Sequence, residues 1–250
     1  MTIAHLSDFH FGQTPKHTAA ALALRDAVKA EGIDFVMVTG DITDRGRSAD
    51  YEQFEAIFGP LRDAGRLFVV PGNHDRQNDN VAARMMSGLR VDGVSRDGMR
   101  VIRIDSTGPH NRWGLVSHGI IDRKVIEDVE RQVDAAAPNE FIVVMLHHHL
   151  LPLPAEGLLE AIAGKIGMPH AAEILLGHTL LGVLRDKAHL ILHGHKHNPS
   201  ELILPNKGRE LRIYNAGCST TLGRFRVFDY ENGMMSGEPR WVKTLTHSEK

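Results

Sequence analysis

The chain has 250 residues, 42% of them hydrophobic, and its 29 Lys and Arg against 31 Asp and Glu give a formal net charge of -2. A chain of this length can bury a full core without disulfides, and nothing in its composition marks a linker, so we expect a single domain over residues 1–250. The balanced charge offers no general basic field for a nucleic acid. The sequence contains no run of eighteen apolar residues, so no membrane span is predicted. We therefore expect neither a nucleic-acid partner nor a membrane, and any anionic substrate must be held by local charge.

Cysteine usage and the first residues indicate the compartment. Cys218 is the one cysteine of the sequence, so no internal disulfide can form, which favours a reducing environment. The first ten residues, MTIAHLSDFH, lack a basic segment followed by a long apolar one, so they do not have the form of a signal peptide. We expect a cytoplasmic location.

Strands and helices alternate at the start of the chain. Short apolar runs predict strands over 2–7, 34–40 and 66–72. Apolar residues at helical spacing predict two helices between them, one over 17–32 closed by Gly32 and one over 48–65 with Ser48 as its N-cap. This β-α-β-α-β order predicts a parallel sheet with helices on its faces.

The remaining elements continue the sheet. Strands are predicted over 100–106, 140–147 and 188–194, with helices near 122–136 and 170–186. After residue 199, consecutive strands separated by Gly or Asn predict an antiparallel edge, with segments at 200–205, 209–217 and 223–233. The pattern alone thus predicts one α/β sheet.

Polar motifs follow five of the predicted strands at the point where each strand ends. They are DFH at 8–10, GDITD at 40–44, GNHD at 72–75, HHH at 147–149 and GHKH at 194–197. Any one of them could hold only a helix cap, a turn residue or a histidine hydrogen-bonded to its surroundings. Ligands of open α/β sheets bind at the carboxyl ends of the strands, so five such ends together predict a shared site.

The order D-x-H, G-D-x-x-D, G-N-H-D, strand-end histidine and G-H-x-H resembles the calcineurin-like metallophosphoesterases. The resemblance extends from residue 2 to about residue 220. It implies a four-layer α/β/β/α sandwich, in which the single predicted sheet divides into two mixed sheets flanked by helices.

The resemblance also implies two divalent metal ions that share Asp41 as a bridging ligand. It assigns three further ligands to each ion, namely Asp8, His10 and His197 to one and Asn73, His147 and His195 to the other. Mixed oxygen and imidazole ligands suit Mn, Fe or Zn better than Mg or Ca. His148 remains an alternative to His147, which is favoured because it directly follows the apolar strand.

Such a site attracts phosphate esters, because two divalent ions outweigh the carboxylates of Asp8 and Asp41 even with a bridging hydroxide present. Metal ions lower the pKa of bound water toward about 7, so we expect in-line attack of that hydroxide on phosphorus. The resemblance places His74 at the transition state or the leaving oxygen, with either Asp44 or Asp75 holding its ring. The alternative is that His74 only caps a turn.

Four residues are candidates for contact with the substrate. His148 follows a ligand, Arg45 and Lys196 lie beside ligands, and Trp113 could stack on a base. Arg45 and Lys196 could equally be solvated charges, and Trp113 a packing residue.

The motifs resemble most closely those of the cyclic-nucleotide phosphodiesterase and glycerophosphodiesterase group, which predicts hydrolysis of a small phosphodiester. Two alternatives keep the same metals: a nuclease, or a phosphomonoesterase or nucleotide pyrophosphatase. A third is a metal-binding scaffold without catalysis. The sequence indicates no oligomeric state.

Overall fold

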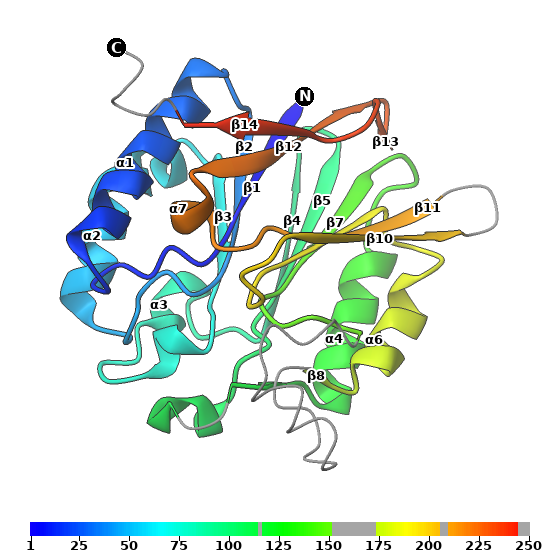
Figure 1. Cartoon of the computed structure of the whole chain (residues 1–250). Helices are drawn as coiled ribbons and strands as arrows, with labels where there is room; N and C mark the ends of the chain where they lie inside the picture. The colour runs from blue at the N-terminus through cyan, green and yellow to red at the C-terminus, as the bar shows by residue number, and fades with distance from the viewer. Residues whose placement is uncertain (115–116, 152–173, 206–209, 245–250) are drawn as a thin grey trace.

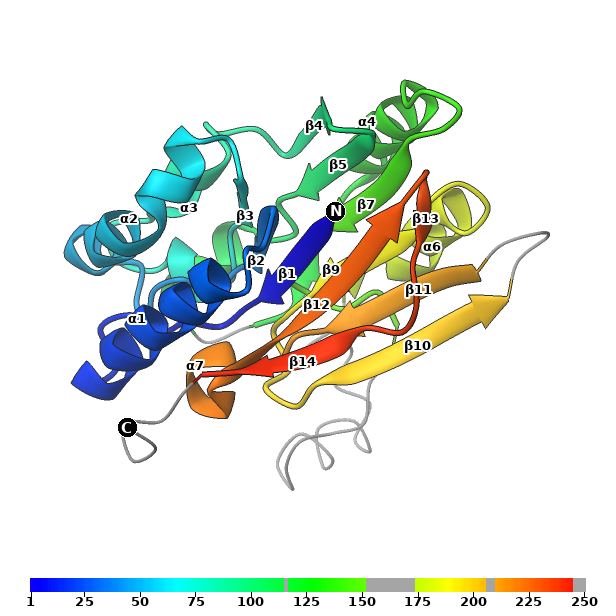
Figure 2. The ribbon, with the colours of Figure 1, turned by 90° about the horizontal axis from the view of Figure 1, so that it is seen from above.

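The computed structural model describes residues 1–114, 117–151, 174–205 and 210–244. Two large sheets face each other, and helices cover the outer face of each (Figures 1 and 2). This is the four-layer α/β/β/α arrangement that the family resemblance implied. The single sheet predicted from the apolar pattern alone is wrong.

The first sheet has the strand order β13-β12-β1-β2-β3, and β14 also pairs with β12. Its strands are β1 (Thr2–Leu6), β2 (Phe35–Thr39), β3 (Leu67–Val70), β12 (Arg224–Glu231), β13 (Met234–Met235) and β14 (Arg240–Lys243). Strands β1, β2 and β3 are parallel, whereas β12 runs antiparallel to β1. The sheet therefore joins the first and the last strands of the described chain.

Two long helices, α1 (Pro15–Ala30) and α2 (Ser48–Asp63), cover this sheet. Helix α1 ends as predicted: Gly32 has φ +62°, and the amides of Gly32 and Ile33 donate to the carbonyls of Lys29 and Val28. The predicted N-cap of α2 is wrong. Ser48 is already helical, and its amide donates to Oδ2 of Asp79 at 2.9 Å.

The second sheet has the order β10-β11-β9-β7-β5-β4. Its strands are β4 (Val91–Arg96), β5 (Met99–Ile104), β7 (Phe141–Met145), β9 (Leu190–His193), β10 (Ser200–Pro205) and β11 (Glu210–Asn215). Helices α4 (Arg123–Asp134) and α6 (Gly177–Leu184) cover it, and residues 170–173 of the helix predicted near 170–186 lie outside the described residues. The predicted antiparallel edge is divided, since β10 and β11 pair antiparallel in this sheet and β12 to β14 belong to the first.

Short elements complete the described chain. They are η1 (His74–Arg76), α3 (Ala82–Met85), η2 (Pro109–Trp113), β6 (Gly119–Ile120), β8 (Ile174–Leu175) and α7 (Ser219–Leu222). No helix among the described residues is long and apolar enough to cross a membrane.

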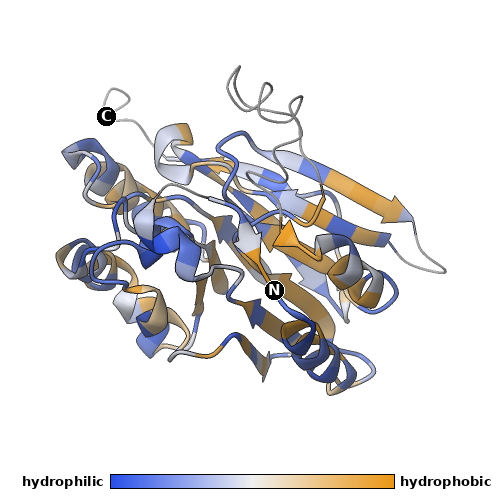
Figure 3. Ribbon diagram, turned by 90° about the horizontal axis from the view of Figure 1, so that it is seen from below, coloured by the Kyte–Doolittle hydropathy of each residue, from blue (hydrophilic) through white to orange (hydrophobic). Residues whose placement is uncertain are grey.

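Side-chain alternation along the strands builds three hydrophobic layers. In β7, Phe141 and Val143 face the other sheet, where they meet Ile3 of β1, while Ile142 faces the layer of α4 and α6. Each buried side chain of this size contributes roughly 1.5–3 kcal/mol relative to leaving it exposed. The inner strands accordingly show mostly hydrophobic colours in Figure 3, and the outer helices show hydrophilic stretches.

Candidate metal centre

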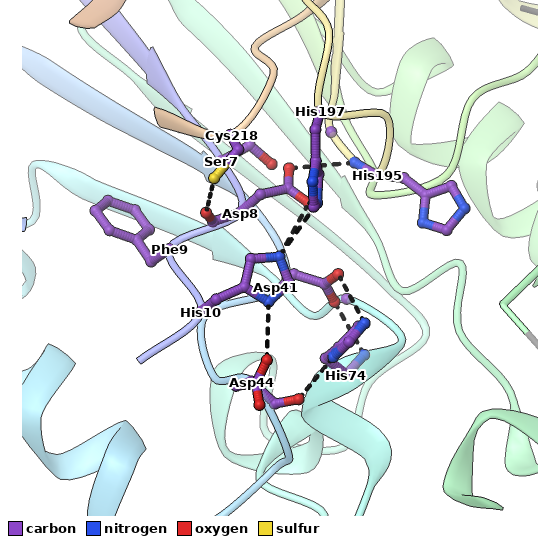
Figure 4. A network of polar contacts seen from close by, with 12 residues as sticks. Ser7, Asp8, Phe9, His10, Asp41, Asp44, His74, His195, His197 and Cys218 are labelled. Carbon is purple, nitrogen blue, oxygen red and sulfur yellow. Dashed lines mark hydrogen bonds and ion pairs between the residues drawn. The ribbon is translucent and has the colours of Figure 1, made fainter. Parts of the chain in front are cut away.

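The carboxyl ends of strands from both sheets meet at one place. The loops after β1, β2 and β3 come from the first sheet, and those after β7 and β9 from the second. Seven predicted ligands gather there, namely Asp8, His10, Asp41, Asn73, His147, His195 and His197. Several of them are labelled in Figure 4.

Four of these residues have a left-handed backbone that non-glycine residues rarely adopt. The φ angles are 55° at Asp8, 50° at His10, 48° at Asp41 and 71° at His195. Such conformations cost of order 1–3 kcal/mol each and persist where the surrounding structure imposes them, often at functional sites.

Asp8, His10 and His197 form the first ligand group. Oδ1 of Asp8 lies 3.9 Å from Nε2 of His10 and 3.7 Å from Nε2 of His197, and the two imidazole nitrogens are 3.3 Å apart. This oxygen of Asp8 is fully buried and has no hydrogen-bond partner among the described residues. An unpaired buried carboxylate oxygen facing two imidazole nitrogens fits a bound cation.

Asp41, Asn73, His147 and His195 form the second ligand group. Oδ1 of Asn73 is 3.1 Å from Nε2 of His147 and 3.1 Å from Nδ1 of His195, while Oδ2 of Asp41 is 3.4 Å from Nε2 of His147. Ligand atoms of Asp8, Asp41 and His147 lie within 4.8 Å of one another. The two groups therefore adjoin at Asp41, and the donor set fits two metal ions.

His147 and His148 differ in which ring nitrogens are engaged. Nδ1 of His147 contacts the carbonyl of Thr39 at 2.7 Å, which leaves Nε2 facing the second ligand group. Both nitrogens of His148 have protein partners, Nδ1 with Oγ of Ser106 at 2.9 Å and Nε2 with the carbonyl of Ser117 at 2.8 Å. His148 nevertheless lies close enough to His147 and His195 to group with them. The geometry favours His147 as the ligand.

Two motif glycines permit this close packing. A Cβ atom on Gly72 would collide with the carboxylate of Asp41, and one on Gly194 would collide with Oγ of Ser7 and lie 2.6 Å from Oδ2 of Asp8. The glycines of GNHD and GHKH are therefore required by the approach of the chain to the two carboxylates.

Burial and neighbouring charges set the pKa values of the two carboxylates in opposite directions. Burial raises the pKa of Asp8 to about 6, partly opposed by His147. Burial acts in the same direction on Asp41, but His147 and His74 overcome it and hold the pKa of Asp41 well below its ordinary value. Asp41 is thus the more firmly ionised of the two.

The histidines of the site also divide. Burial lowers the pKa of His10 to about 3 and that of His195 well below its ordinary value, so both rings are neutral, as metal ligands must be. Burial opposes the charge of His147 as well, but Asp41 and Asp8 raise its pKa to about 9.

His74 lies at the open side of the site. Its Nδ1 contacts the main-chain carbonyl of Asp44 at 2.6 Å, and its Nε2 is 4.0 Å from Oδ2 of Asp41. The charge of Asp41 raises the pKa of His74, opposed by burial and supported by the Asp44 carbonyl. A ring that is held at Nδ1 and favours its protonated form is suited to donate a proton from Nε2.

Asp44 and Asp75 occupy different positions relative to His74. The carboxylate of Asp75 accepts from the amides of Gly72, Ile42 and Thr43 at 2.9, 3.2 and 2.9 Å. Asp75 therefore supports the turn that carries Asp41. The contact with the His74 ring comes from Asp44, through its main chain.

The four candidate substrate contacts occupy different surroundings. Trp113, in η2, is 78% exposed, and Arg45 is exposed with Nε 3.4 Å from Oδ2 of Asp44. Lys196 is buried, unlike a solvated loop charge, and the ring of His148 is held as described above.

Two supporting residues escaped the sequence reasoning. Ser106 donates or accepts at Nδ1 of His148, and the carbonyl of Thr39 fixes the ring of His147. Thr39 closes the apolar run FVMVT and Ser106 follows RVIRID, so both stand at strand ends, which was the available signal.

Comparison with known proteins agrees with this geometry. The family model described as calcineurin-like phosphoesterase matches residues 1–199. The 3',5'-cyclic adenosine monophosphate phosphodiesterase CpdA of Pseudomonas aeruginosa is 28% identical over 163 residues, which cover 62% of this chain and 57% of that protein. The chain thus matches little more than half the length of that relative.

Two further proteins are similar over more of the chain. The glycerophosphodiester phosphodiesterase GpdQ of Enterobacter lignolyticus is 28% identical over 221 residues, covering 79% of this chain and 71% of that protein. A dimetal phosphatase structure from Danio rerio superposes with a TM-score of 0.67 at 13% identity, covering 98% of this chain and 99% of the other. The structural likeness shows a shared fold.

Proposed function

Because the chain belongs to the calcineurin-like phosphoesterase family, we propose that it is a metal-dependent phosphodiesterase acting on a small phosphodiester, such as a cyclic nucleotide or a glycerophosphodiester. The observation that carries the proposal is the pair of ligand groups that adjoin at Asp41, with His74 beside them. Relatives named for cyclic nucleotide and glycerophosphodiester hydrolysis support the substrate class.

The proposed cofactors are two divalent ions, Mn, Fe or Zn, chosen because the donors mix carboxylate, amide and imidazole. Asp8, His10 and His197 would hold one, Asn73, His147 and His195 the other, and Asp41 both. Bound there, the ions would lower the pKa of water toward about 7 and offset charge on the phosphoryl oxygens.

The proposed role of His74 is to protonate the leaving oxygen. The Asp44 carbonyl accepts from Nδ1, which leaves Nε2 facing the site, and the charge of Asp41 raises the pKa of the ring. Positioned proton donors of this kind contribute about a hundredfold or more in rate.

The balanced charge of the chain favours a small substrate that is bound by the site itself. The chain carries a formal net charge of -2, so it supplies no general attraction for a polyanion. A small diester needs only the local charge, with Arg45 and Trp113 as proposed contacts at the rim.

A panel of three substrates tests the proposal. Protein loaded with Mn²⁺ should hydrolyse bis-p-nitrophenyl phosphate and leave p-nitrophenyl phosphate and single-stranded DNA largely intact. Preference for the monoester or for DNA would point to the phosphomonoesterase or the nuclease, and metal binding without any hydrolysis would point to a scaffold. Cyclic nucleotides, glycerophosphodiesters and nucleotide anhydrides would then identify the compound.

We also propose that residues 1–250 form a single domain in the cytoplasm. Pairing of β1 with β12 joins the first strand to one from the last part of the described chain, and the one cysteine, Cys218, is a free buried thiol. Both features support the proposal.

A further inference from the structure

A short segment that begins with the last residue of β11 and leads toward β12 crosses from the second sheet to the first beside the first ligand group. It comprises residues 215–220 and is called the brace segment below. It lies beyond residue 199, where the match to the family model ends. None of its residues is a metal ligand in the proposed site.

One part of the brace segment holds the turn that carries Asp8. Sγ of Cys218 donates to the carbonyl of Asp8 at 3.1 Å, as Figure 4 shows. The hydroxyl of Thr220 donates to the same carbonyl at 3.4 Å. Ser219 and Ser7 exchange two further bonds, from the Ser219 amide to the Ser7 carbonyl and from the Ser7 amide to Oγ of Ser219, each at 3.0 Å.

The other part holds the loop that carries His197. The side-chain amide of Asn215 donates to the carbonyls of Lys196 at 2.8 Å and Asn198 at 3.0 Å, on either side of His197. The amide of Cys218 donates to the carbonyl of His197 itself at 3.2 Å. Asn215 is completely buried, so these bonds are not shared with solvent.

These contacts add to the bonds that Asp8 makes elsewhere, from its amide to the Gly40 carbonyl at 3.0 Å and from the His195 amide to its Oδ2 at 3.2 Å. Asp8 has the unfavourable φ of 55°, which persists only where neighbouring groups impose it. The side chain of His197 is 55% exposed, so its position depends on its backbone. The brace segment bonds to the main chain at both places and thereby links the two ligand loops.

We propose that Asn215 and Cys218 are positioning residues for the first metal ion, acting through the main chain of the two ligand loops. The inference rests on the proposed two-metal function. Contacts that orient metal ligands are worth about 10- to 100-fold in metal affinity, which is the size of effect we expect.

Calorimetric titration of metal-free protein with Mn²⁺ tests this inference without using activity. Cys218→Ala should lower the affinity for one of the two Mn²⁺ ions about tenfold. Asn215→Ala should lower the affinity for the same ion by up to about a hundredfold. The ion that binds more weakly should be the same ion whose binding His197→Ala abolishes. Cys218→Ser keeps a hydrogen-bond donor and should bind more tightly than Cys218→Ala.

Tyr230→Phe is the matched control. The Tyr230 hydroxyl also donates to a main-chain carbonyl, that of Asp97 at 2.7 Å, but it lies between β12 and the β4–β5 turn. This variant should lose stability in urea yet bind both equivalents with wild-type affinity. If Asn215→Ala does not fold, Cys218→Ala and Cys218→Ser decide the question.

Different results would overturn the proposed function and the role of the brace segment. Wild-type protein that binds no metal would overturn the proposed function. Wild-type protein that binds two ions, together with a folded Cys218→Ala variant of unchanged affinity, would overturn the role of the brace segment alone.

Discussion

Nε2 of His147 lies 3.4 Å from Oδ2 of Asp41, although the two residues follow strands of different sheets. Asp41 comes after β2 in the first sheet and His147 after β7 in the second. The same ring reaches the carbonyl of Thr39 through Nδ1 at 2.7 Å. The proposed metal centre therefore forms only when the two sheets pack, and it ties their carboxyl ends together.

Replacing Asp41 by Asn should remove both metal ions. The substitution keeps the shape of the side chain but removes the charge that adjoins both ligand groups. We expect the affinity for each ion to fall by more than about a hundredfold, because losing a ligand costs more than losing a contact that only orients one. Titration with Mn²⁺ measures this, with Asp97→Asn in the exposed β4–β5 turn as a control that should retain both ions.

Replacing His74 by Gln should lower turnover about a hundredfold or more while both ions stay bound. The loss should be smaller for a p-nitrophenyl diester than for an alkyl diester, because the nitrophenolate leaves without protonation. Steady-state rates on both substrates, with metal content measured on the same samples, provide the test. An equal loss on both would contradict a proton-donor role.

Metal removal should lower thermal stability. In the metal-free protein, burial raises the pKa of Asp8 to about 6 because its charge is unfavourable there, and a bound cation compensates that charge. Mn²⁺ at a hundred times its dissociation constant should add about 2.7 kcal/mol per site. Thermal melts with EDTA and with Mn²⁺ should therefore differ for the wild type and coincide for Asp41→Asn.

Acid should destabilise the fold through His5, which is fully buried with Nε2 3.0 Å from the hydroxyl of Thr39. Burial, followed by the charges of His193 and Arg226, lowers the pKa of His5 well below its ordinary 6.5. Unfolded His5 gains a proton below that value and folded His5 does not. Its contribution to stability is therefore present above about pH 6.5 and is lost as the pH falls toward the folded pKa.

His5→Leu should reduce the dependence of the free energy of unfolding on pH. Each unit of pH below 6.5 costs the wild type up to about 1.4 kcal/mol through this one group. Urea unfolding in EDTA between about pH 7 and pH 5 should show the smaller slope in the variant. Parallel slopes would mean that His5 titrates alike in both states.

The order of the elements was predictable because short buried strands and amphipathic helices leave distinct periods in the sequence. The division into two sheets was not, because an apolar run does not specify its neighbour. Strand β4 was missed because none of Val91–Arg96 is fully buried, so the segment carries no apolar run. Asp97 and Gly98 nevertheless form a turn with both φ angles positive, which is a hairpin signal.

The gathering of the candidate ligands was predictable, since strand ends that carry Asp, Asn and His meet at one edge. Their assignment to two metal ions stays a prediction. The contacts that support these residues were not predictable. Cys218 is buried, and its bond to the Asp8 carbonyl joins segments far apart in the sequence, so no sequence pattern indicates it. The contact between the Asp44 carbonyl and the His74 ring could not be predicted either, because main-chain contacts do not depend on residue type.

Anomalous scattering from crystals soaked with manganese would test the central claim most directly. The account predicts two peaks per chain, roughly 3.5–4 Å apart, both in contact with the carboxylate of Asp41. A single peak, or two peaks of which one lies away from Asp41, would contradict it.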